Sequence, residues 1–392
     1  MKIEAININN FRVFKKVKIS ELPSMCVFVG ANGSGKSTLF DIFCFLRDAL
    51  THNVRQALAR RGGFKEVISR DADGPIEIEL KFREPGDPLV TYSLAIGLKD
   101  GLPVVERELL KYRRGNTGKP WHFLDFRYGK GAAVVNEEDY GNPDAEMKRD
   151  EQELESADIL ALKGLGQFQR FKVVSAFRRM IEDWHVSDFH ISDARPSQEA
   201  GYAEHLSSTG ENLALVAQYM YEHHQESFTK VLDKMSHRVP GVTEVKAATT
   251  EDGRIVLKFQ DGSFKDPFVA RYVSDGTVKM FAYLLLLHDP APHPLLCLEE
   301  PENQLYPKLL RELAEEFRLY SLRGGQVFIS THSPDFLNGV KLEEIFWLTK
   351  EAGFTTMKHA MSDDPLLQNL FQEGDLPGAL WKQGFFKGAD PQ

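Results

Sequence analysis

The chain has 392 residues, a formal net charge of −9 and 42% hydrophobic residues, a composition typical of globular proteins. Its longest apolar runs fall far short of the ~20 residues that a membrane-spanning helix needs, so we expect no membrane partner. A strand-like pattern begins at once, without a secretory signal, and the three cysteines show no metal-binding spacing. These features together predict a cytoplasmic protein with reduced thiols.

Basic residues gather in four short stretches of this acidic chain, within residues 15–18, 60–65, 111–119 and 178–179. Acidic residues lie between the stretches, which favours solvated faces over one continuous nucleic-acid groove. DNA is therefore a partner that the sequence allows without demonstrating it.

The first functional signal along the chain is a glycine-rich loop. It follows an apolar run at Met25–Val29 and precedes a helical pattern that begins near Lys36. The loop consists of Gly30, Ala31, Asn32, Gly33, Ser34, Gly35, Lys36, Ser37 and Thr38. In such a loop, backbone N–H groups surround a phosphate chain, the lysine reaches the β- and γ-phosphates, and the next hydroxyl binds Mg²⁺. The sequence therefore predicts a nucleoside-triphosphate site.

A β-rich region follows the first helix. Apolar and polar residues alternate over residues 76–82, and similar runs cover 90–98 and 104–112, with an Asp-Gly turn before the last. This pattern predicts an antiparallel subsidiary sheet beside the nucleotide core.

Helical patterns dominate the next part of the chain. We expect helices over residues 144–162, 173–184 and 211–236, followed by a hairpin around 254–262. The interpretation is an inserted helical lobe at approximately residues 140–290. The Gly- and Pro-rich segment 363–392 is predicted to be a surface tail.

A phosphate loop alone leaves kinases, GTPases, helicases and transporters open, and an acidic strand end narrows the choice. The buried run Leu295–Leu298 is followed by Glu299 and Glu300. Adjacent strand residues point to opposite faces, so the two acids can take separate roles at the carboxyl end of the strand. We expect Glu299 to serve Mg²⁺, directly or through its water shell, and Glu300 to polarise an attacking water.

Two further segments flank this strand. Upstream, Ser274 is a natural N-cap of the helix that follows, and Gly276 lets first-turn amides approach an anion. Downstream, the apolar run Gln326–Ser330 leads to His332. A histidine at the carboxyl edge of a core strand can hydrogen-bond a γ-phosphate and respond to its loss.

In combination these motifs resemble the SMC/RecF-type branch of the ATP-binding-cassette superfamily. The closer resemblance is to its compact ATPases, a group that includes the heads of OLD-family nucleases and ATPase subunits of anti-phage systems. The resemblance rests on residues 10–14, 30–38, 272–277, 299–307 and 330–334. It implies an α/β ABC-type head with a mixed central sheet, an antiparallel subsidiary sheet and a helical signature lobe, forming one head over residues 1–392.

The resemblance also implies an activity, ATP hydrolysis, with ATP and Mg²⁺ as cofactors. Lys36 and Ser37 would hold phosphates and metal, and Glu299 would take the metal-associated acidic position. Glu300 would be the general base and His332 the switch.

A homodimer follows from the same resemblance, because heads of this type close around two ATP molecules. Ser274 and Gly276 would then act in trans, and residues 302–307 would line the dimer seam. Arg12, in the opening strand at residues 10–14, would lie near the nucleotide or, equally, on the surface.

Three departures from the family pattern stand out. Glutamate at position 299 replaces the usual aspartate, which predicts altered magnesium geometry and slow hydrolysis. Asp275 occupies a signature position where many cassettes have glycine. The glutamine that normally senses the metal is not assigned, and Gln167 and Gln169 are its candidates.

The expected biological role is a switch in DNA maintenance or anti-phage defence that gates a separately encoded nuclease-like effector. One alternative is a clamp that binds DNA directly through the basic stretches. Another is a nucleotide-loaded scaffold with little turnover. A transporter ATPase is disfavoured, because the antiparallel and helical elaboration is typical of the SMC branch.

Overall fold

The structure is a computed structural model that describes residues 1–83, 88–113, 120–142, 145–187, 189 and 191–389. Within these residues the chain forms two compact units, which are described separately. Unit 1 comprises Met1–Trp184, Glu343–Asn369 and Gln383–Gln392, and unit 2 comprises His185–Leu342 and Leu370–Lys382. Residues 140–184 of the predicted helical lobe thus belong to unit 1, so the chain divides later than we expected. Arg114 and Lys119, two of the predicted basic residues, lie outside the described residues.

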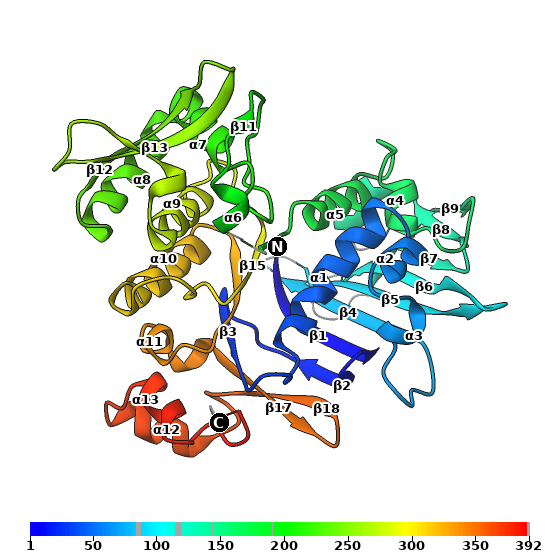
Figure 1. Cartoon of the computed structure of the whole chain (residues 1–392). Helices are drawn as coiled ribbons and strands as arrows, with labels where there is room; N and C mark the ends of the chain where they lie inside the picture. Colours follow the sequence, from blue (N-terminus) through cyan, green and yellow to red (C-terminus); the bar gives the residue numbers. More distant parts are fainter. Residues whose placement is uncertain (84–87, 114–119, 143–144, 188, 190, 390–392) are drawn as a thin grey trace. The chain divides into compact units, whose positions relative to one another are not determined.

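Unit 1 contains the predicted antiparallel sheet. Its eight strands follow the order β2-β1-β4-β5-β6-β7-β8-β9, and each neighbouring pair is antiparallel (Figure 1). The strands are β1 Lys2–Phe11, β2 Phe14–Ile19, β4 Ile76–Arg83, β5 Val90–Lys99, β6 Leu102–Tyr112, β7 Trp121–Arg127, β8 Lys130–Val134 and β9 Arg149–Glu153. Strand β4 alternates buried and exposed residues over its length, which is the pattern of a sheet with one face on a core.

A second strand group in unit 1 holds the segment that leads into the glycine-rich loop. Strand β3 (Met25–Val29) is buried throughout and pairs in parallel with β17 (Ile345–Glu351). Strand β18 (Phe354–His359) pairs with β17 in the antiparallel sense. A five-residue run that is wholly apolar and buried is typical of a parallel core strand, because neither face meets water.

Short and long helices complete unit 1. They are α1 Lys36–Thr51, α2 Val54–Ala59, α3 Phe64–Val67, η1 Glu137–Gly141, α4 Ala161–Leu165 and α5 Lys172–Glu182. Helix α1 packs Phe45 against Phe11 of β1, and α5 packs Phe177 against Phe82 of β4, each pair edge to face. These aromatic contacts fix both helices on the antiparallel sheet.

Unit 2 contains three parallel strands and a small antiparallel sheet. The parallel strands are β10 His185–Ser187, β15 Leu295–Glu299 and β16 Gln326–Ser330, with β15 paired to both others. The antiparallel strands are β11 Gln198–Glu199, β12 Val242–Thr249, β13 Arg254–Asp261 and β14 Phe268–Val269. Strand β13 pairs with the other three, which confirms a hairpin around residues 254–262.

Helices surround the strands of unit 2, and its longest ones match the predicted apolar periodicity. They are α6 Ile191–Ala194, α7 Leu213–His223, α8 Gln225–Arg238, η2 Ala270–Tyr272, α9 Asp275–Leu287, η3 Pro307–Leu309, α10 Leu310–Leu322, α11 Pro334–Leu337 and α13 Pro377–Lys382. The elements η4 Leu342–Glu344 and α12 Pro365–Gln372 span the boundaries between the units. The predicted helix over 211–236 is two helices that meet at His224.

Three local predictions are wrong. Residues 149–153 form an edge strand rather than a helix, because pairing with β8 overrides the helix propensity of their Arg, Glu and Gln side chains. The predicted strand at residues 10–14 is interrupted by a turn, with Asn10 and Arg12 at φ of 60° and 48°. The predicted surface tail forms α12 and α13 instead. Its side chains Leu367, Leu380 and Trp381 are each at most 1% exposed, so they belong to the core.

None of the helices among the described residues combines the length and apolar character needed to cross a bilayer.

Candidate functional site

The glycine-rich loop of unit 1 has the backbone that its sequence predicts. Gly33 and Gly35 have φ of 76° and 107°, values that side chains with a Cβ rarely adopt. A Cβ on Gly30 would meet the Leu348 carbonyl oxygen at 2.6 Å. Glycine is thus required at these positions by backbone conformation or by close packing.

A neighbouring strand holds the loop in place. The Thr355 hydroxyl of β18 donates a 2.6 Å hydrogen bond to the Ser34 carbonyl, and Thr355 N donates to the Val13 carbonyl. A Cβ on Gly35 would lie 2.8 Å from the same Thr355 hydroxyl. No local pattern could point to Thr355, because it lies 321 positions beyond Ser34.

The loop lysine and hydroxyls lie where α1 begins. Lys36 is 7% exposed, and its Nζ donates to the carbonyls of Gly30 and Ala31 at 2.8 and 3.3 Å. Ser37 and Asn32 are exposed, and Thr38 is half-buried. The amides of the first turn and the lysine thus frame a concave backbone suited to an anion.

Arg12 forms an ion pair with Asp41 of α1. Its Nη1 lies 2.9 Å from Asp41, which also accepts from Arg61 Nε at 2.7 Å. Arg61 reaches Asp48 as well, at 2.8 Å, and its side chain is 8% exposed. Asp41 and Asp48 lie two turns apart on one face of α1. This spacing was a signal for a site that binds arginine side chains, and sequence reasoning missed it. A nucleotide role for Arg12 stays a prediction.

In unit 2, the acidic pair after β15 is arranged differently from the prediction. Glu299 ends the strand, whereas Glu300 lies beyond it with φ of 43°, a left-handed conformation that is uncommon for this residue type. Glu300 N donates to the Ser330 carbonyl at 2.9 Å, so the turn is tied to β16. The carboxylates are therefore separated by a turn rather than by strand alternation alone.

The Glu300 carboxylate is oriented by two side chains. His332 Nε2 lies 3.3 Å from Oε1, and Asn303 Nδ2 donates to Oε2 at 2.9 Å. The structure thus brings the predicted general base and the predicted switch into direct contact. Both oxygens of this carboxylate thus have a side-chain partner, and the two contacts restrict its orientation.

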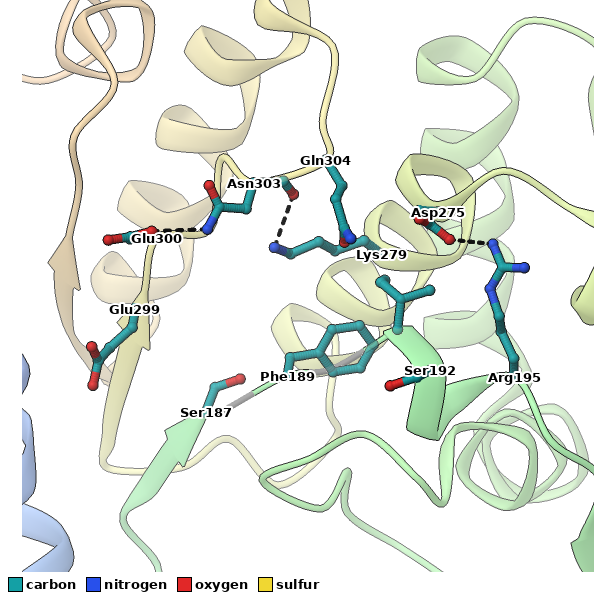
Figure 2. A pocket seen from close by; sticks show the side chains of 11 residues that line it. Ser187, Phe189, Ser192, Arg195, Asp275, Lys279, Glu299, Glu300, Asn303 and Gln304 are labelled. Atoms are coloured by element: carbon teal, nitrogen blue, oxygen red, sulfur yellow. Dashed lines mark hydrogen bonds and ion pairs between the residues drawn. The ribbon is translucent and has the colours of Figure 1, made fainter.

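Lys279 supports this arrangement from the buried side of α9. Its Nζ donates to the Asn303 carbonyl at 2.9 Å, as Figure 2 shows. Burial lowers the pKa of Lys279 to about 8, against the opposing effect of Glu302 and Glu300. Sequence reasoning missed Lys279 and Asn303, although a lysine within an otherwise apolar helix was an available signal.

Glu302 holds the segment that carries His332. Its Oε1 accepts from the Thr331 hydroxyl at 2.6 Å and from His332 N at 2.8 Å. Burial raises the pKa of this carboxyl. Glu302 is half-buried, whereas Gln304 and Tyr306 are exposed, and a dimer seam along residues 302–307 stays a prediction.

The start of α9 has the predicted N-cap. The exposed Ser274 accepts from Thr277 N at 3.2 Å. A Cβ on Gly276 would meet the Gln304 carbonyl oxygen at 2.7 Å. Glycine is thus required at position 276 by packing against the segment after Glu300, a reason that sequence reasoning missed.

Asp275 is neutralised by an arginine from a distant segment. Arg195 forms an ion pair with the Asp275 carboxylate and donates to the Val273 carbonyl at 2.7 Å. An acidic residue at a helix N-terminus would otherwise compete with a bound anion. The departure from glycine at this position is therefore compensated within unit 2.

The acidic turn and the start of α9 border one pocket of about 900 Å³ within unit 2 (Figure 2). Its polar lining includes Arg195, Asp275, Lys279, Glu299, Glu300 and Asn303. Mg²⁺ prefers oxygen ligands. Glu299 and Glu300 offer carboxylate oxygens in unit 2, and Ser37 offers a hydroxyl oxygen in unit 1. The two glutamine candidates, Gln167 and Gln169, are exposed in unit 1.

The predicted site residues thus form two sets. The glycine-rich loop, Lys36, Ser37 and Arg12 belong to unit 1. Glu299, Glu300, His332, Ser274 and Gly276 belong to unit 2.

The amino-acid sequence matches a known protein family over most of its length. Residues 25–338 match the AAA_21 family, described as "AAA domain, putative AbiEii toxin, Type IV TA system". Two curated relatives are DNA replication and repair proteins RecF. The one from Clavibacter sepedonicus is 34% identical over 70 residues, covering 17% of each chain. The one from Heliobacterium modesticaldum is 30% identical over 87 residues, covering 21% of this chain and 23% of the relative. The chain thus matches only about a fifth of the length of these relatives.

Solved structures show the fold. An SMC head bound to the C-terminal winged-helix domain of ScpA has a TM-score of 0.56 at 16% identity, with 91% of this chain and 97% of that chain covered. An SMC head with an extended coiled coil, bound to the C-terminal domain of ScpA derived from Pyrococcus furiosus, has a TM-score of 0.52 at 12% identity, with 95% and 98% covered. These likenesses confirm the predicted fold class, the mixed α/β fold of an SMC head.

Proposed function

We propose that this chain, a member of the AAA_21 family with relatives of the SMC/RecF type, is an ABC ATPase that binds and hydrolyses ATP as a nucleotide-dependent switch. The observation that carries this proposal is the glycine-rich loop of unit 1. Its positive-φ glycines, the buried Lys36 and the start of α1 form the arrangement that cradles phosphates.

The residues of unit 2 supply the second part of the proposed chemistry. Glu300, oriented by Asn303 and His332, would accept a proton from the attacking water. The Ser37 hydroxyl of unit 1 would bind Mg²⁺, which would neutralise phosphate charge, and Glu299 of unit 2 offers a carboxylate for the same kind of ion. The protein's contribution is then positioning and electrostatic stabilisation rather than covalent chemistry.

We propose further that two copies close around two ATP molecules. Ser274, at the N-terminal end of α9, is exposed. The Asp275 carboxylate beside it is neutralised by its ion pair with Arg195. This end of α9 could therefore bind the γ-phosphate held by the loop of a second copy. ATP would bind the paired state more strongly than the separate state, which is what makes a nucleotide a switch.

The proposed biological role is control of a separately encoded nuclease-like effector in DNA maintenance or anti-phage defence. The family description, which names a toxin–antitoxin system, supports defence, and the RecF relatives support DNA maintenance. SMC heads solved with ScpA support the general idea that such a head binds a partner protein.

Phosphate release from the purified chain tests the enzymatic proposal. Glu300→Gln keeps a hydrogen-bonding group for Asn303 but removes the base, so turnover should fall roughly 100- to 10,000-fold while ATP still binds. Glu315→Gln, an exposed carboxylate on α10, is the matched control and should hydrolyse ATP like the unchanged protein. Wild-type release that equals the release by Glu300→Gln would exclude Glu300 as the base and favour the low-turnover scaffold.

The second candidate function is a direct DNA clamp. Lys15, Lys16 and Lys18 are exposed on β2, which favours it, whereas Arg60 and Arg61 are already paired with Asp48. DNA affinity that falls steeply with salt and drops when the three lysines become glutamine would support the clamp. Salt-independent or undetectable DNA binding would leave the effector switch.

A further inference from the structure

Three residues of unit 2 that take no part in the proposed ATP chemistry form a cluster of potential metal ligands. They are His205, Asp289 and His293, and one ligating atom from each lies within 4.8 Å of the others. We propose that this cluster binds one divalent transition-metal ion of the zinc class. Zinc–ligand bonds of 2.0–2.2 Å place tetrahedral ligand atoms roughly 3.3 Å apart, so side-chain rotation suffices to close the site.

The donor set identifies the class of metal. Two imidazoles and one carboxylate suit Zn²⁺ and its neighbours in the first transition row, whereas Mg²⁺ prefers oxygen ligands alone. The site is therefore chemically different from the magnesium site proposed beside ATP. With three protein ligands, a fourth position is left for water.

The carboxylate is placed for this role. The Asp289 side chain is 5% exposed, and its Oδ2 lies 2.7 Å from His205 Nδ1. Its other oxygen accepts from Ala291 N at 2.9 Å, which fixes the carboxylate plane. A carboxylate with one oxygen anchored to the backbone and the other directed at an imidazole is pre-oriented to bind a cation.

Both histidines are held through their backbones by residues outside the cluster. The His205 carbonyl accepts from Asn212 Nδ2 at 2.9 Å, and the His293 carbonyl accepts from the Tyr320 hydroxyl at 2.9 Å. A third histidine, His185, packs against the His293 ring at a centroid distance of 4.9 Å. The cluster is thus supported by neighbouring elements rather than suspended on one loop.

The position in the chain suggests what the metal would do. Asp289 and His293 lie in the connection between α9, which ends at Leu287, and β15, which begins at Leu295. His205 belongs to the separate segment that precedes α7. A bound ion would join these two segments and restrain the connection between α9 and β15.

Co²⁺ is the probe that tests the site, because its visible absorption reports tetrahedral nitrogen and oxygen ligands. Untagged full-length protein, stripped of metal with a chelator, should bind one equivalent of Co²⁺, and Zn²⁺ should displace it whereas millimolar Mg²⁺ should not. His205→Ala should weaken binding at least tenfold and abolish the tetrahedral absorption. This side chain is 42% exposed, so its removal leaves the fold intact.

Two controls make the test specific. His237→Ala removes an exposed histidine of α8 outside the cluster and should bind Co²⁺ normally. Lys36→Ala should also bind it normally, because the glycine-rich loop is not involved. As a second readout, Zn²⁺ should raise the unfolding temperature of the unchanged protein but not that of His205→Ala.

The proposal is overturned if His205→Ala and His293→Ala bind Co²⁺ with unchanged affinity and absorption, or if the unchanged protein binds less than one equivalent at micromolar Co²⁺. Should His293→Ala fail to fold, His205→Ala alone decides the outcome.

Discussion

The glycine-rich loop of unit 1 and the acidic turn of unit 2 are built in different ways. The loop owes its shape to glycines within nine consecutive residues, with one brace from Thr355. The turn at Glu300 owes its shape to side chains from three segments, through Lys279, Asn303 and His332. A site made of backbone tolerates side-chain changes around it, whereas a site made of side chains depends on each of its contacts.

The greatest loss of ATP affinity should follow removal of the lysine in the glycine-rich loop. Lys36→Ala should weaken ATP binding about 100-fold, because truncating a buried charged partner of a phosphate costs several kcal/mol. Fluorescent-nucleotide titration measures this change. Lys65→Ala, an exposed lysine of α3, is the control, and equal affinities for the two variants would contradict a role for Lys36.

A loss of stability should follow when the hydrogen bonds between Glu302 and the segment that carries His332 are removed. Glu302→Ala leaves the Thr331 hydroxyl and His332 N without their acceptor, so unfolding free energy should fall by about 1–3 kcal/mol. Chemical denaturation measures it, with Glu315→Ala as the exposed control. A loss no larger than that of the control would mean that Glu302 does not support the His332 segment.

A smaller change in turnover is expected when only the orientation of the Glu300 carboxylate is altered. Asn303→Ala removes the donor to Glu300 Oε2, so kcat should fall about tenfold, the equivalent of roughly 1.4 kcal/mol, with ATP affinity unchanged. Gln372→Ala alters an exposed side chain of α12 outside the pocket and should leave kcat unchanged. Equal turnover in both variants would show that Glu300 needs no support from Asn303.

The smallest effect concerns a buried carboxyl within unit 1. Glu108 accepts from the amides of Ala161 and Leu162 and from Tyr92, and burial raises its pKa to about 7. The folded state then holds a proton that the unfolded state releases near pH 4.5, so stability falls as pH rises through 7. We expect a loss of about 1 kcal/mol between pH 6 and pH 8 from this group.

Unfolding curves at the two pH values measure this dependence. Glu108→Gln carries no ionisable proton at this position, and its stability should therefore fall less over the same interval. Identical pH slopes for the two proteins would contradict a raised pKa for Glu108.

The same contrast explains how much the sequence could predict. The loop at residues 30–38, the strand ahead of it and the N-cap at Ser274 are local patterns, and the structure has each of them. Lys279, Glu302 and Asn303 were missed as supporting residues because their partners are set by tertiary packing.

Local propensity failed where pairing or burial decided the outcome. Residues 149–153 are rich in helix-favouring side chains but form the edge strand β9, and the tail inserts Trp381 into a core. Arg12 was expected near the nucleotide or on the surface, and the structure shows that Asp41 holds it, a contact that no periodicity in residues 10–14 could reveal.

An ATP-dependent pairing of two heads would change the mass of the protein in solution with Mg²⁺ and ATP. Light scattering on Glu300→Gln should give twice the mass of the 44.4-kDa chain with ATP and the single mass without it. Adding Lys36→Ala or Ser274→Arg to Glu300→Gln should restore the single mass, and the Ser274→Arg variant should still bind ATP. A Glu300→Gln protein that has the same mass with and without ATP would contradict the account.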